Sequence, residues 1–322
     1  MSETTEDERN ASTPVVDRTK TEEASTARAL GFVGLGAMGL PMAVSAARHH
    51  ALLGCDVDPV RLALLVDEVG QRSTVHTTPV VAEVGARCDV VVLMLPSSTE
   101  VDSAVQELAE TLKPGALVID MGSSIPGETR RLAAKLAAVG IRFMDAPVSG
   151  SVAKARDGTL SILAGGAEAD IDLAIPYLRA IGEKIIRTGP VGSAHAMKAL
   201  NNFVYAAGLL ATVEALRMGE AVGLDLSVLT DVLNASSGRN VATETKVKQF
   251  ILPGTYAGGF RLGLMAKDLE TAAALAEETG VPAVSLATCL EVWRRALDNL
   301  GPEADNTEIH RLIAAGTGHA SG

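Results

Sequence analysis

Aromatic residues are scarce in this chain, where they make up 3% of 322 residues. A core built on large rings is therefore excluded, and Ala, Val and Leu must fill the interior, since hydrophobic residues still account for 47% of the sequence. The 31 glycines suit a fold with many tight turns between strands and helices. Because domains commonly contain about 100–200 residues, the length predicts two of them.

The three cysteines, Cys55, Cys88 and Cys289, are few and lie far apart. Their spacing matches neither a metal motif nor a disulfide framework, which makes a reducing cytoplasm the expected location. Cys55 and Cys289 stand in apolar runs and are predicted to be core residues. The six histidines form no cluster, so no metal site is expected.

The chain also lacks any tract rich in Lys or Arg, and its formal net charge is −11. Nucleic acid and anionic membrane surfaces are therefore not expected as partners. No apolar run is expected to reach the length of a transmembrane helix, and the first residues lack the basic and apolar regions of a signal peptide. A small anionic substrate is still compatible with this charge, because a few local cations and backbone N–H groups suffice to bind it.

Polar and charged residues without periodicity fill positions 1–28, which are predicted to form a disordered acidic tail. From residue 29 to residue 192, short apolar runs alternate with helical stretches. This alternation is typical of a Rossmann-type, doubly wound α/β domain whose parallel sheet is covered on both faces. The predicted strands are 29–35, 51–55, 89–95, 116–120, 142–145, 160–164 and 184–187, and the predicted helices are 43–49, 101–112 and 128–139.

The pattern changes after residue 192, and residues 193–322 are predicted to form an all-α domain. An Ala- and Leu-rich stretch without proline, 193–223, is apolar on more than one face, so this helix is expected to be buried and to join the two domains. The same apolar character predicts packing between subunits, as a homodimer or homotetramer. Further helices are predicted at 226–235, 243–251, 264–279 and 285–300.

A glycine motif, G-x-G-x-x-G, follows the first predicted strand and opens a helix. Gly34 permits a tight turn, Gly36 leaves room for a pyrophosphate, and Gly39 lets helix and strand pack closely. The helix N-terminus then favours the negative charge of the phosphates. The other interpretation, a turn without a ligand, explains neither the strand and helix on each side nor the downstream acid. The residues predicted to surround the pyrophosphate are Gly34, Leu35, Gly36, Ala37, Met38 and Gly39.

The downstream acid is Asp56, at the end of the second predicted strand and about 20 residues after the glycine motif. A carboxylate at this place accepts a hydrogen bond from a ribose 2′-hydroxyl and repels a 2′-phosphate. Val57 supplies no cation, and Asp58 adds negative charge. The sequence therefore predicts NAD as the cofactor, with NADP disfavoured.

Five separated motifs and a weaker sixth extend along the chain from about residue 30 to residue 298. With them the chain resembles the β-hydroxyacid dehydrogenase family, which includes 3-hydroxyisobutyrate dehydrogenase, tartronate semialdehyde reductase and glyoxylate/succinic semialdehyde reductases. The motifs are GFVGLGAMGLPMA (31–43), MLP (94–96), DMGSSIP (120–126), DAPVSGS (145–151) with GTL (158–160), GPVGSAHAMKALNN (189–202), and Phe260 with LMAKDL (264–269).

The resemblance implies further contacts for the cofactor and for the substrate carboxylate. Its motifs place the substrate acid group at Ser149, Gly150 and Ser151. The chain departs from the family at Ser151 and Ala194, where a glycine is usual, so the substrate contacts at Ser151 stay open. The cofactor contacts implied by the resemblance are Leu95, Pro96, Ser123, Phe260 and Lys267.

Lys198 and Asn202 are four residues apart, so they share one face of the long predicted helix. The resemblance makes Lys198 the catalytic residue and Asn202 the residue that orients it or the substrate. Oxidation of an alcohol by hydride transfer needs a base for the hydroxyl proton, and the reverse reduction needs an acid. Periodicity alone favours a different interpretation, in which the lysine extends its head into water.

Arg239 and Asn240 lie in a predicted break between helices of the second domain. Similar loops in the family face the substrate, so Arg239 is a candidate for a second acidic or polyhydroxy group, while an exposed loop arginine is the equal alternative. His195, three residues before Lys198, is close enough to touch the site, but it is expected to support the site from behind or to have a structural role.

The predicted activity is NAD-dependent oxidation of a small β-hydroxy acid to the semialdehyde or keto acid, or the reverse reduction. An imine reductase on the same fold is an alternative, although such enzymes typically lack the lysine. Oxidative decarboxylation and a non-catalytic NAD-binding assembly module are further alternatives. The sequence leaves the substrate open among 3-hydroxyisobutyrate, glycerate-like and threonate-like acids and a sulfonate analogue.

Overall fold

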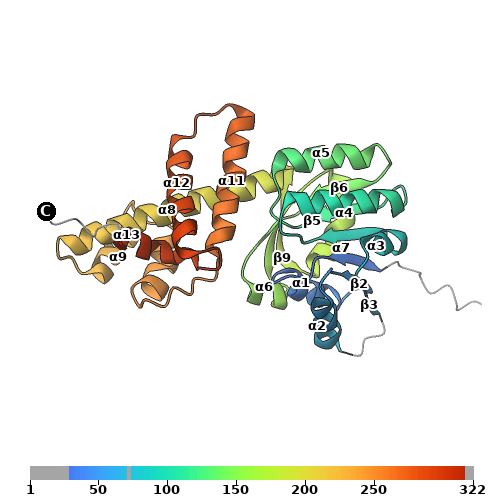
Figure 1. Cartoon of the computed structure of the whole chain (residues 1–322), viewed down its shortest axis with the longest axis horizontal. Coiled ribbons are helices and arrows are strands. Elements are labelled where there is room, and N and C mark those ends of the chain that lie inside the picture. Colours follow the sequence, from blue (N-terminus) through green and yellow to red (C-terminus); the bar gives the residue numbers. More distant parts are fainter. Residues whose placement is uncertain (1–28, 71–73, 316–322) are drawn as a thin grey trace, which may run out of the picture.

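The structure is a computed structural model, and it describes residues 29–70 and 74–315. The predicted tail, 1–28, lies outside the described residues. Figure 1 shows two halves, one built around a sheet and one built of helices, with a long helix running from the first half into the second.

The sheet half contains all seven predicted strands and two further ones, β3 and β7. Strand order in the sheet is β3-β2-β1-β4-β5-β6-β8-β7, and β9 pairs with β8. The strands are β1 (Leu30–Val33), β2 (Leu52–Cys55), β3 (Val75–Thr78), β4 (Val90–Leu93), β5 (Leu117–Asp120), β6 (Arg142–Asp145), β7 (Val148–Ser149), β8 (Leu160–Gly165) and β9 (Gly182–Gly189).

The expectation of a wholly parallel sheet is wrong at one place, because β8 runs antiparallel to β6 and β7. A parallel return needs a crossover of a dozen or more residues, usually containing a helix that crosses the sheet face. Between β6 and β8 the chain offers only β7 and the six-residue helix α6, so the strand turns back. The twelve-residue helix α7 then allows β9 to return parallel to β8.

Helices cover both faces of the sheet. Successive side chains of a strand point to opposite faces, so a strand that is apolar throughout needs cover on both. Phe32 packs on the face under α1, α2, α6 and α7, whereas its neighbour Val33 packs on the face under α3, α4 and α5. The first predicted helix starts too late, since the helix begins at the third glycine of the motif. The helices are α1 (Gly39–Ala46), α2 (Pro59–Val69), α3 (Val81–Arg87), α4 (Ser98–Thr111), α5 (Pro126–Ala137), α6 (Val152–Asp157) and α7 (Glu168–Arg179).

The helical half forms a second core around Trp293, Leu209 and Val213. The predicted helix at 243–251 is interrupted at Lys246, where an α-helix changes to a π-helical turn. The elements are α8 (Ser193–Ala221), α9 (Leu226–Ala235), α10 (Val241–Thr245), the π-helix η1 (Val247–Ile251), α11 (Leu262–Thr279), α12 (Val284–Leu300), the 3-10 helix η2 (Asn306–Glu308) and α13 (Ile309–Ala315).

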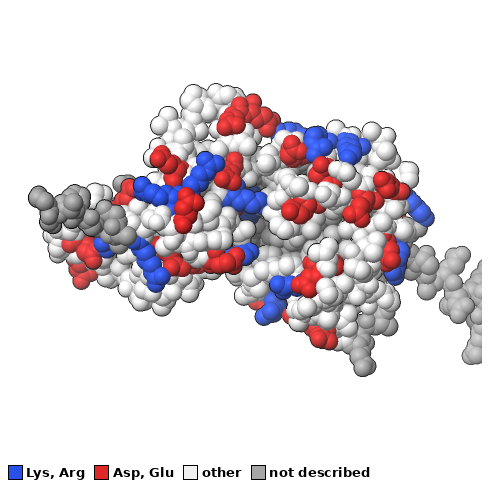
Figure 2. Space-filling view, in the orientation of Figure 1, with Lys and Arg blue, Asp and Glu red and all other residues white. Residues whose placement is uncertain are grey.

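Helix α8 links the two halves and packs against α11 and α12. An 18-residue window in it reaches a mean hydropathy of 1.2, so by length and composition it qualifies as a membrane-spanning helix, contrary to the sequence expectation. This is weak evidence for a membrane, because core helices of water-soluble proteins meet the same criterion. Figure 2 shows basic and acidic side chains interspersed over the same face of the molecule.

Candidate active site

A pocket of about 680 Å³ is lined by residues from both halves of the molecule. The glycine motif, the ends of several strands, α4, α8 and α11 all contribute to its wall. The predicted site residues that line it are Gly34, Gly36, Ala37, Met38, Gly39, Asp56, Leu95, Pro96, Ser123, Gly150, Lys198, Phe260 and Lys267.

The three glycines of the motif meet different surroundings. Gly34 has a φ of +96°, and a Cβ there would lie 2.3 Å from the Met94 carbonyl oxygen. A Cβ on Gly39 would lie 1.9 Å from the Gly34 carbonyl oxygen, whereas a Cβ on Gly36 would meet nothing within 4 Å. Gly34 and Gly39 are therefore required by the protein's own packing, and the space beside Gly36 is open to a ligand. Helix α1 begins there with no side-chain cap and no acidic residue in its first turn, which suits a phosphate.

Asp56 follows β2 and faces the same pocket. One carboxylate oxygen accepts from the Leu35 N–H at 2.7 Å, and the other accepts from the Asp58 N–H at 2.9 Å. Asp58 instead caps α2 by accepting from the Val60 N–H. Asp56 is thus held in place by the backbone of the turn that carries the glycine motif, and its oxygens keep lone pairs for a ribose hydroxyl.

Lys198 lies at the other end of the pocket, in the second turn of α8. Its Nζ donates to the Val148 carbonyl oxygen at 2.9 Å, and the side chain is half-buried. Gly150, two residues beyond Val148, lines the same wall with a φ of +146°. The lysine head is therefore held inside the pocket wall instead of extending freely into water.

Sequence reasoning missed Asp268, the residue that links this end of the pocket together. Its carboxylate accepts hydrogen bonds from the Ser123 hydroxyl and from the Asn202 amide, and its exposed fraction is 3%. These two donors come from the turn after β5 and from α8, while Asp268 itself belongs to α11. The sequence did offer one signal, because Asp268 lies on a helix face that Met265 and Leu269 make apolar. An acid on such a face is expected to be buried beside a hydrogen-bond partner.

Lys267 spans the two halves beside this acid. Its Nζ donates to the Pro96 carbonyl oxygen at 2.6 Å. Burial lowers the pKa of the Lys267 amine and Lys198 adds to that effect, while Asp268 and nearby carboxylates oppose it. The pocket therefore holds two amines, those of Lys198 and Lys267, which suits an anionic ligand.

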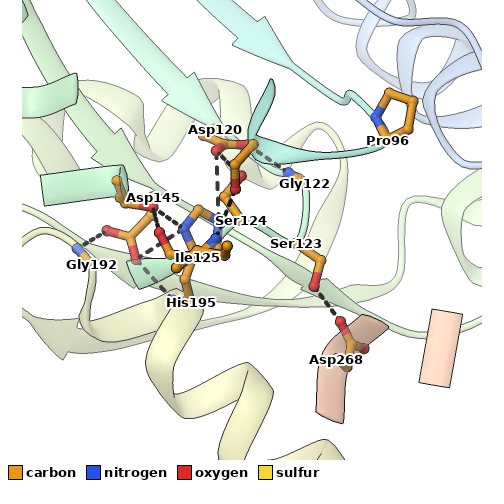
Figure 3. Close-up of polar contacts among 12 residues, drawn as sticks. Pro96, Asp120, Gly122, Ser123, Ser124, Ile125, Asp145, Gly192, His195 and Asp268 are labelled. Atoms are coloured by element: carbon orange, nitrogen blue, oxygen red, sulfur yellow. Dashed lines mark hydrogen bonds and ion pairs between the residues drawn. The ribbon is translucent and has the colours of Figure 1, made fainter. Parts of the chain in front are cut away.

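A buried polar cluster lies behind the pocket, at the ends of β5 and β6 (Figure 3). Asp120, Asp145 and His195 are each at most 1% exposed. Burial raises the pKa of the Asp145 carboxyl, and His195 together with the N–H groups of Gly192 and His195 counteracts part of this rise. Such groups persist in a core only when they are paired.

Four predicted substrate residues are not brought to the pocket. Ser149 is exposed, and the Ser151 hydroxyl accepts from the Lys154 N–H at 3.4 Å as the N-cap of α6. The Arg239 side chain is 65% exposed and lies 3.6 Å from Glu244.

Asn240 is the fourth, and it forms a capping box at the start of α10. Its side chain accepts from the Ala242 and Thr243 N–H groups, and the Thr243 hydroxyl oxygen accepts from the Asn240 N–H. The amide of Asn240 also donates to the Thr212 hydroxyl. In this chain these contacts give Asn240 a structural position.

Comparison with known proteins agrees with this arrangement. Residues 29–189 match the NAD-binding domain of 6-phosphogluconate dehydrogenase, and residues 192–313 match the NAD-binding domain of NADP-dependent 3-hydroxyisobutyrate dehydrogenase. Together these features define a two-domain, NAD(P)-binding oxidoreductase.

Similar proteins include the mitochondrial 3-hydroxyisobutyrate dehydrogenase of Mus musculus, 35% identical over 82% of this chain and 81% of that protein. The 2-(hydroxymethyl)glutarate dehydrogenase of Eubacterium barkeri is 32% identical over 82% of this chain and 87% of that protein. The NAD-dependent L-serine dehydrogenase of Pseudomonas aeruginosa is 34% identical over 88% of this chain and 97% of that protein. Among solved structures, Mycobacterium tuberculosis 3-hydroxyisobutyrate dehydrogenase with L-serine superposes with a TM-score of 0.83 at 27% identity, covering 89% of this chain and 99% of that chain.

The chain belongs to the β-hydroxyacid dehydrogenase family, to which 3-hydroxyisobutyrate dehydrogenase also belongs. It is an oxidoreductase that acts on the CH–OH group of small hydroxy acids with NAD or NADP. Imine reductases share the fold, as the enzyme from Streptomyces aurantiacus shows with a TM-score of 0.58 at 19% identity, covering 88% of this chain and 99% of that chain.

Proposed function

We propose that this enzyme oxidises the alcohol of a small β-hydroxy acid with NAD, and that Lys198 is its general base. The observation that carries the proposal is the placement of the Lys198 amine in the same pocket as the glycine motif and Asp56. The open space beside Gly36 and the ordered Asp56 carboxylate fit a dinucleotide. When bound, the nicotinamide ring supplies the hydride acceptor.

The proposed substrate carries a carboxylate and a hydroxymethyl group on the same carbon. This feature is common to 3-hydroxyisobutyrate, serine and 2-(hydroxymethyl)glutarate, which the names of the three relatives contain. The turn at Gly150, which lines the pocket beside Lys198, is the proposed contact for the carboxylate. Oxidation of the primary alcohol then yields a semialdehyde.

In the proposed reaction the neutral Lys198 amine takes the hydroxyl proton while hydride leaves the carbon. The Val148 carbonyl holds the amine by one of its hydrogens, which leaves the nitrogen lone pair free to accept the proton. Asn202 and Ser123 both donate hydrogen bonds to Asp268, so the three residues form a fixed set of polar groups at the Lys198 end of the pocket. In the reverse direction the Lys198 ammonium returns the proton to the carbonyl oxygen.

A second copy of the chain is proposed to cover the exposed side of α8. Met197, Leu200 and Val204 lie at helical spacing and are 47%, 45% and 69% exposed. A row of this kind is more apolar than a solvated helix face, which favours a homodimer with α8 in the interface. Sedimentation of wild type and of Val204→Glu tests this, since the variant should shift toward monomer.

The test of the proposed activity is NAD reduction with a panel of hydroxy acids, including L-serine and 3-hydroxyisobutyrate. The same panel is repeated with NADP, and a cyclic imine with reduced cofactor tests the imine reductase alternative. We expect turnover with hydroxymethyl acids and none with the imine. Imine reduction without hydroxy-acid oxidation would contradict the proposal.

A further inference from the structure

His195 is a buried histidine in the first turn of α8 that the proposed chemistry does not use. It precedes Lys198 by three residues, and its exposed fraction is 1%. Ring nitrogens in such a place need partners, because an unpaired polar group in a core costs free energy. The contacts of this ring therefore show what the residue does.

The backbone around His195 is anchored to the end of β6. One oxygen of Asp145 accepts from the Gly192 N–H at 2.7 Å, and the other accepts from the His195 N–H at 2.9 Å. Asp145 thus caps α8 from another element and offsets the positive end of the helix dipole. Gly165 leaves the space for this contact, since a Cβ there would lie 2.7 Å from the carboxylate.

The ring of His195 adds a contact away from the helix axis. Its Nδ1 lies 2.8 Å from the hydroxyl oxygen of Thr129 on α5. The same Thr129 hydroxyl lies 3.1 Å from the Ile125 carbonyl oxygen, so the ring of His195 is hydrogen-bonded to a side chain that also contacts the backbone at the start of α5. A contact away from the helix axis resists rotation of α8 about that axis. The Asp145 cap lies at the end of the helix and resists such rotation less.

The opposite edge of the ring faces the turn that carries Ser123. Nε2 lies 3.9 Å from Asp120, and it has no hydrogen-bond partner among the described residues (Figure 3). Asp120 accepts from the Gly122 N–H and the Ser124 hydroxyl, on either side of Ser123. The imidazole therefore fills the space between the turn that presents Ser123 and the helix that presents Lys198.

We propose that His195 is a positioning residue, whose ring holds the first turn of α8 against α5 and the end of β5 and so sets the direction of the Lys198 amine. This inference rests on the role proposed above for Lys198. Proton transfer depends steeply on geometry, and a displacement of about 1 Å far from the reacting atoms costs up to about 10²-fold in rate. The effect of losing the ring contact should therefore appear in kcat.

Kinetics of three variants test the proposal. His195→Leu keeps the volume but removes the hydrogen bond between Nδ1 and Thr129, and we expect kcat to fall at least about tenfold while the Kd for NAD stays within about twofold. His195→Asn places an amide donor near the position of Nδ1 and should restore kcat to within about threefold of wild type. Thr129→Val removes the hydroxyl partner at equal shape, and its loss of kcat should not add to that of His195→Leu.

Leu178→Ala is the matched control, because it removes buried packing in α7 without touching the His195 contacts. It should lower the melting temperature and leave kcat unchanged. Wild-type kcat in His195→Leu would overturn the proposal. Failure of His195→Asn to restore kcat, with fully additive losses for His195→Leu and Thr129→Val, would overturn it as well.

Amide hydrogen exchange gives a reading that does not depend on activity. In His195→Leu we expect faster exchange over residues 193–202 and unchanged exchange over 209–216, deeper in the same helix. If the wild-type protein oxidises no hydroxy acid, the proposed function fails, whereas unchanged exchange over 193–202 in His195→Leu shows that the ring does not hold this turn.

Discussion

The two ends of the pocket are built in different ways. At the glycine-motif end, the turn after β1 and the end of β2 make the site, and the Asp56 carboxylate is held by the N–H of Leu35 in that turn, 21 residues earlier in the chain. At the Lys198 end, side chains from the turn after β5, from α8 and from α11 meet through Asp268. Substitutions at the first end should therefore alter binding through space and backbone conformation, whereas substitutions at the second end should alter the rate through geometry.

Replacement of Lys198 by alanine should have the largest effect. Loss of general acid–base catalysis is worth about 10²–10⁴ in rate, or roughly 3–5 kcal/mol of barrier. The Kd for NAD should hardly change, because the glycine motif lies at the other end of the pocket. Steady-state kinetics and a cofactor titration on folded Lys198→Ala measure both quantities, with the exposed Lys184→Ala as control.

If Lys198→Ala keeps near-native kcat, Lys198 is not the base. If Lys198→Ala is inactive only because NAD no longer binds, Lys198 is a cofactor-binding residue. The two ends of the pocket would then both act on binding, and neither on the rate alone.

Alanine at two glycines of the motif should separate binding from folding. Gly36→Ala adds a methyl group to open space, so the free energy of unfolding should stay within about 0.5 kcal/mol while NAD affinity falls at least about tenfold, roughly 1.4 kcal/mol. Gly39→Ala forces a methyl group against the Gly34 carbonyl and should destabilise the fold by about 1–3 kcal/mol or more. Denaturant unfolding and a cofactor titration measure the two effects.

Equal loss of stability in Gly36→Ala would show that its surroundings are packed. Unchanged NAD affinity would show that the pyrophosphate does not bind beside Gly36.

Cofactor preference should change less steeply. Because a 2′-phosphate would meet the Asp56 carboxylate, we expect kcat/KM to favour NAD over NADP by at least about tenfold, roughly 1.4 kcal/mol. Asp56→Ser should bring the two values closer together by removing the negative charge. Equal use of both cofactors by the wild-type enzyme would mean that Asp56 does not face the ribose.

Buried thiols in the two halves should respond alike to pH. Burial raises the pKa of the Cys55 thiol to about 12 and that of the Cys289 thiol to about 11. Neither should react with a disulfide reagent at pH 8 in the native state, because the thiolate is the reactive form. Because burial disfavours only the thiolate, these thiols leave stability unaffected below the unfolded pKa, near 9, and should lower it as pH rises from there through the folded pKa.

Thiol counting before and after denaturation, with mass mapping of Cys55 and Cys289, checks this expectation. Rapid native labelling of Cys55 alone would show that the pocket wall at the glycine-motif end opens to solvent.

Arg239→Ala should have the smallest effect. Its ion pair with Glu244 is exposed, and such pairs are worth about 0–1 kcal/mol. We expect KM and kcat within about twofold of wild type for every active substrate, as measured across the hydroxy-acid panel. A substrate-dependent rise in KM would instead place Arg239 at a binding surface that a single chain does not complete.

Patterns local in the sequence determined much of this protein. The glycine motif, Asp56 and the alternation of apolar runs with helices predicted the α/β domain and the seven main strands, because strand burial and tight turns depend on neighbouring residues. Five separated motifs and a weaker sixth, the one around Lys198 among them, likewise predicted the family. For these features a residue's type and its near neighbours are sufficient.

Only the tertiary structure decided the rest. Strand β8 runs antiparallel, and Ser123 and Asn202 are hydrogen-bonded to Asp268, through contacts between segments that are distant in the sequence. Asn240 forms a helix cap instead of facing the pocket, which is a choice between two local conformations. His195 does not stand out in a hydrophobic pattern. Asp268 interrupts an apolar helix face, but the role of a buried polar residue is identified only by the partner that pairs with it. That partner is brought near by the packing of whole helices against the sheet, which depends on the free energy of the complete fold and not on any one segment.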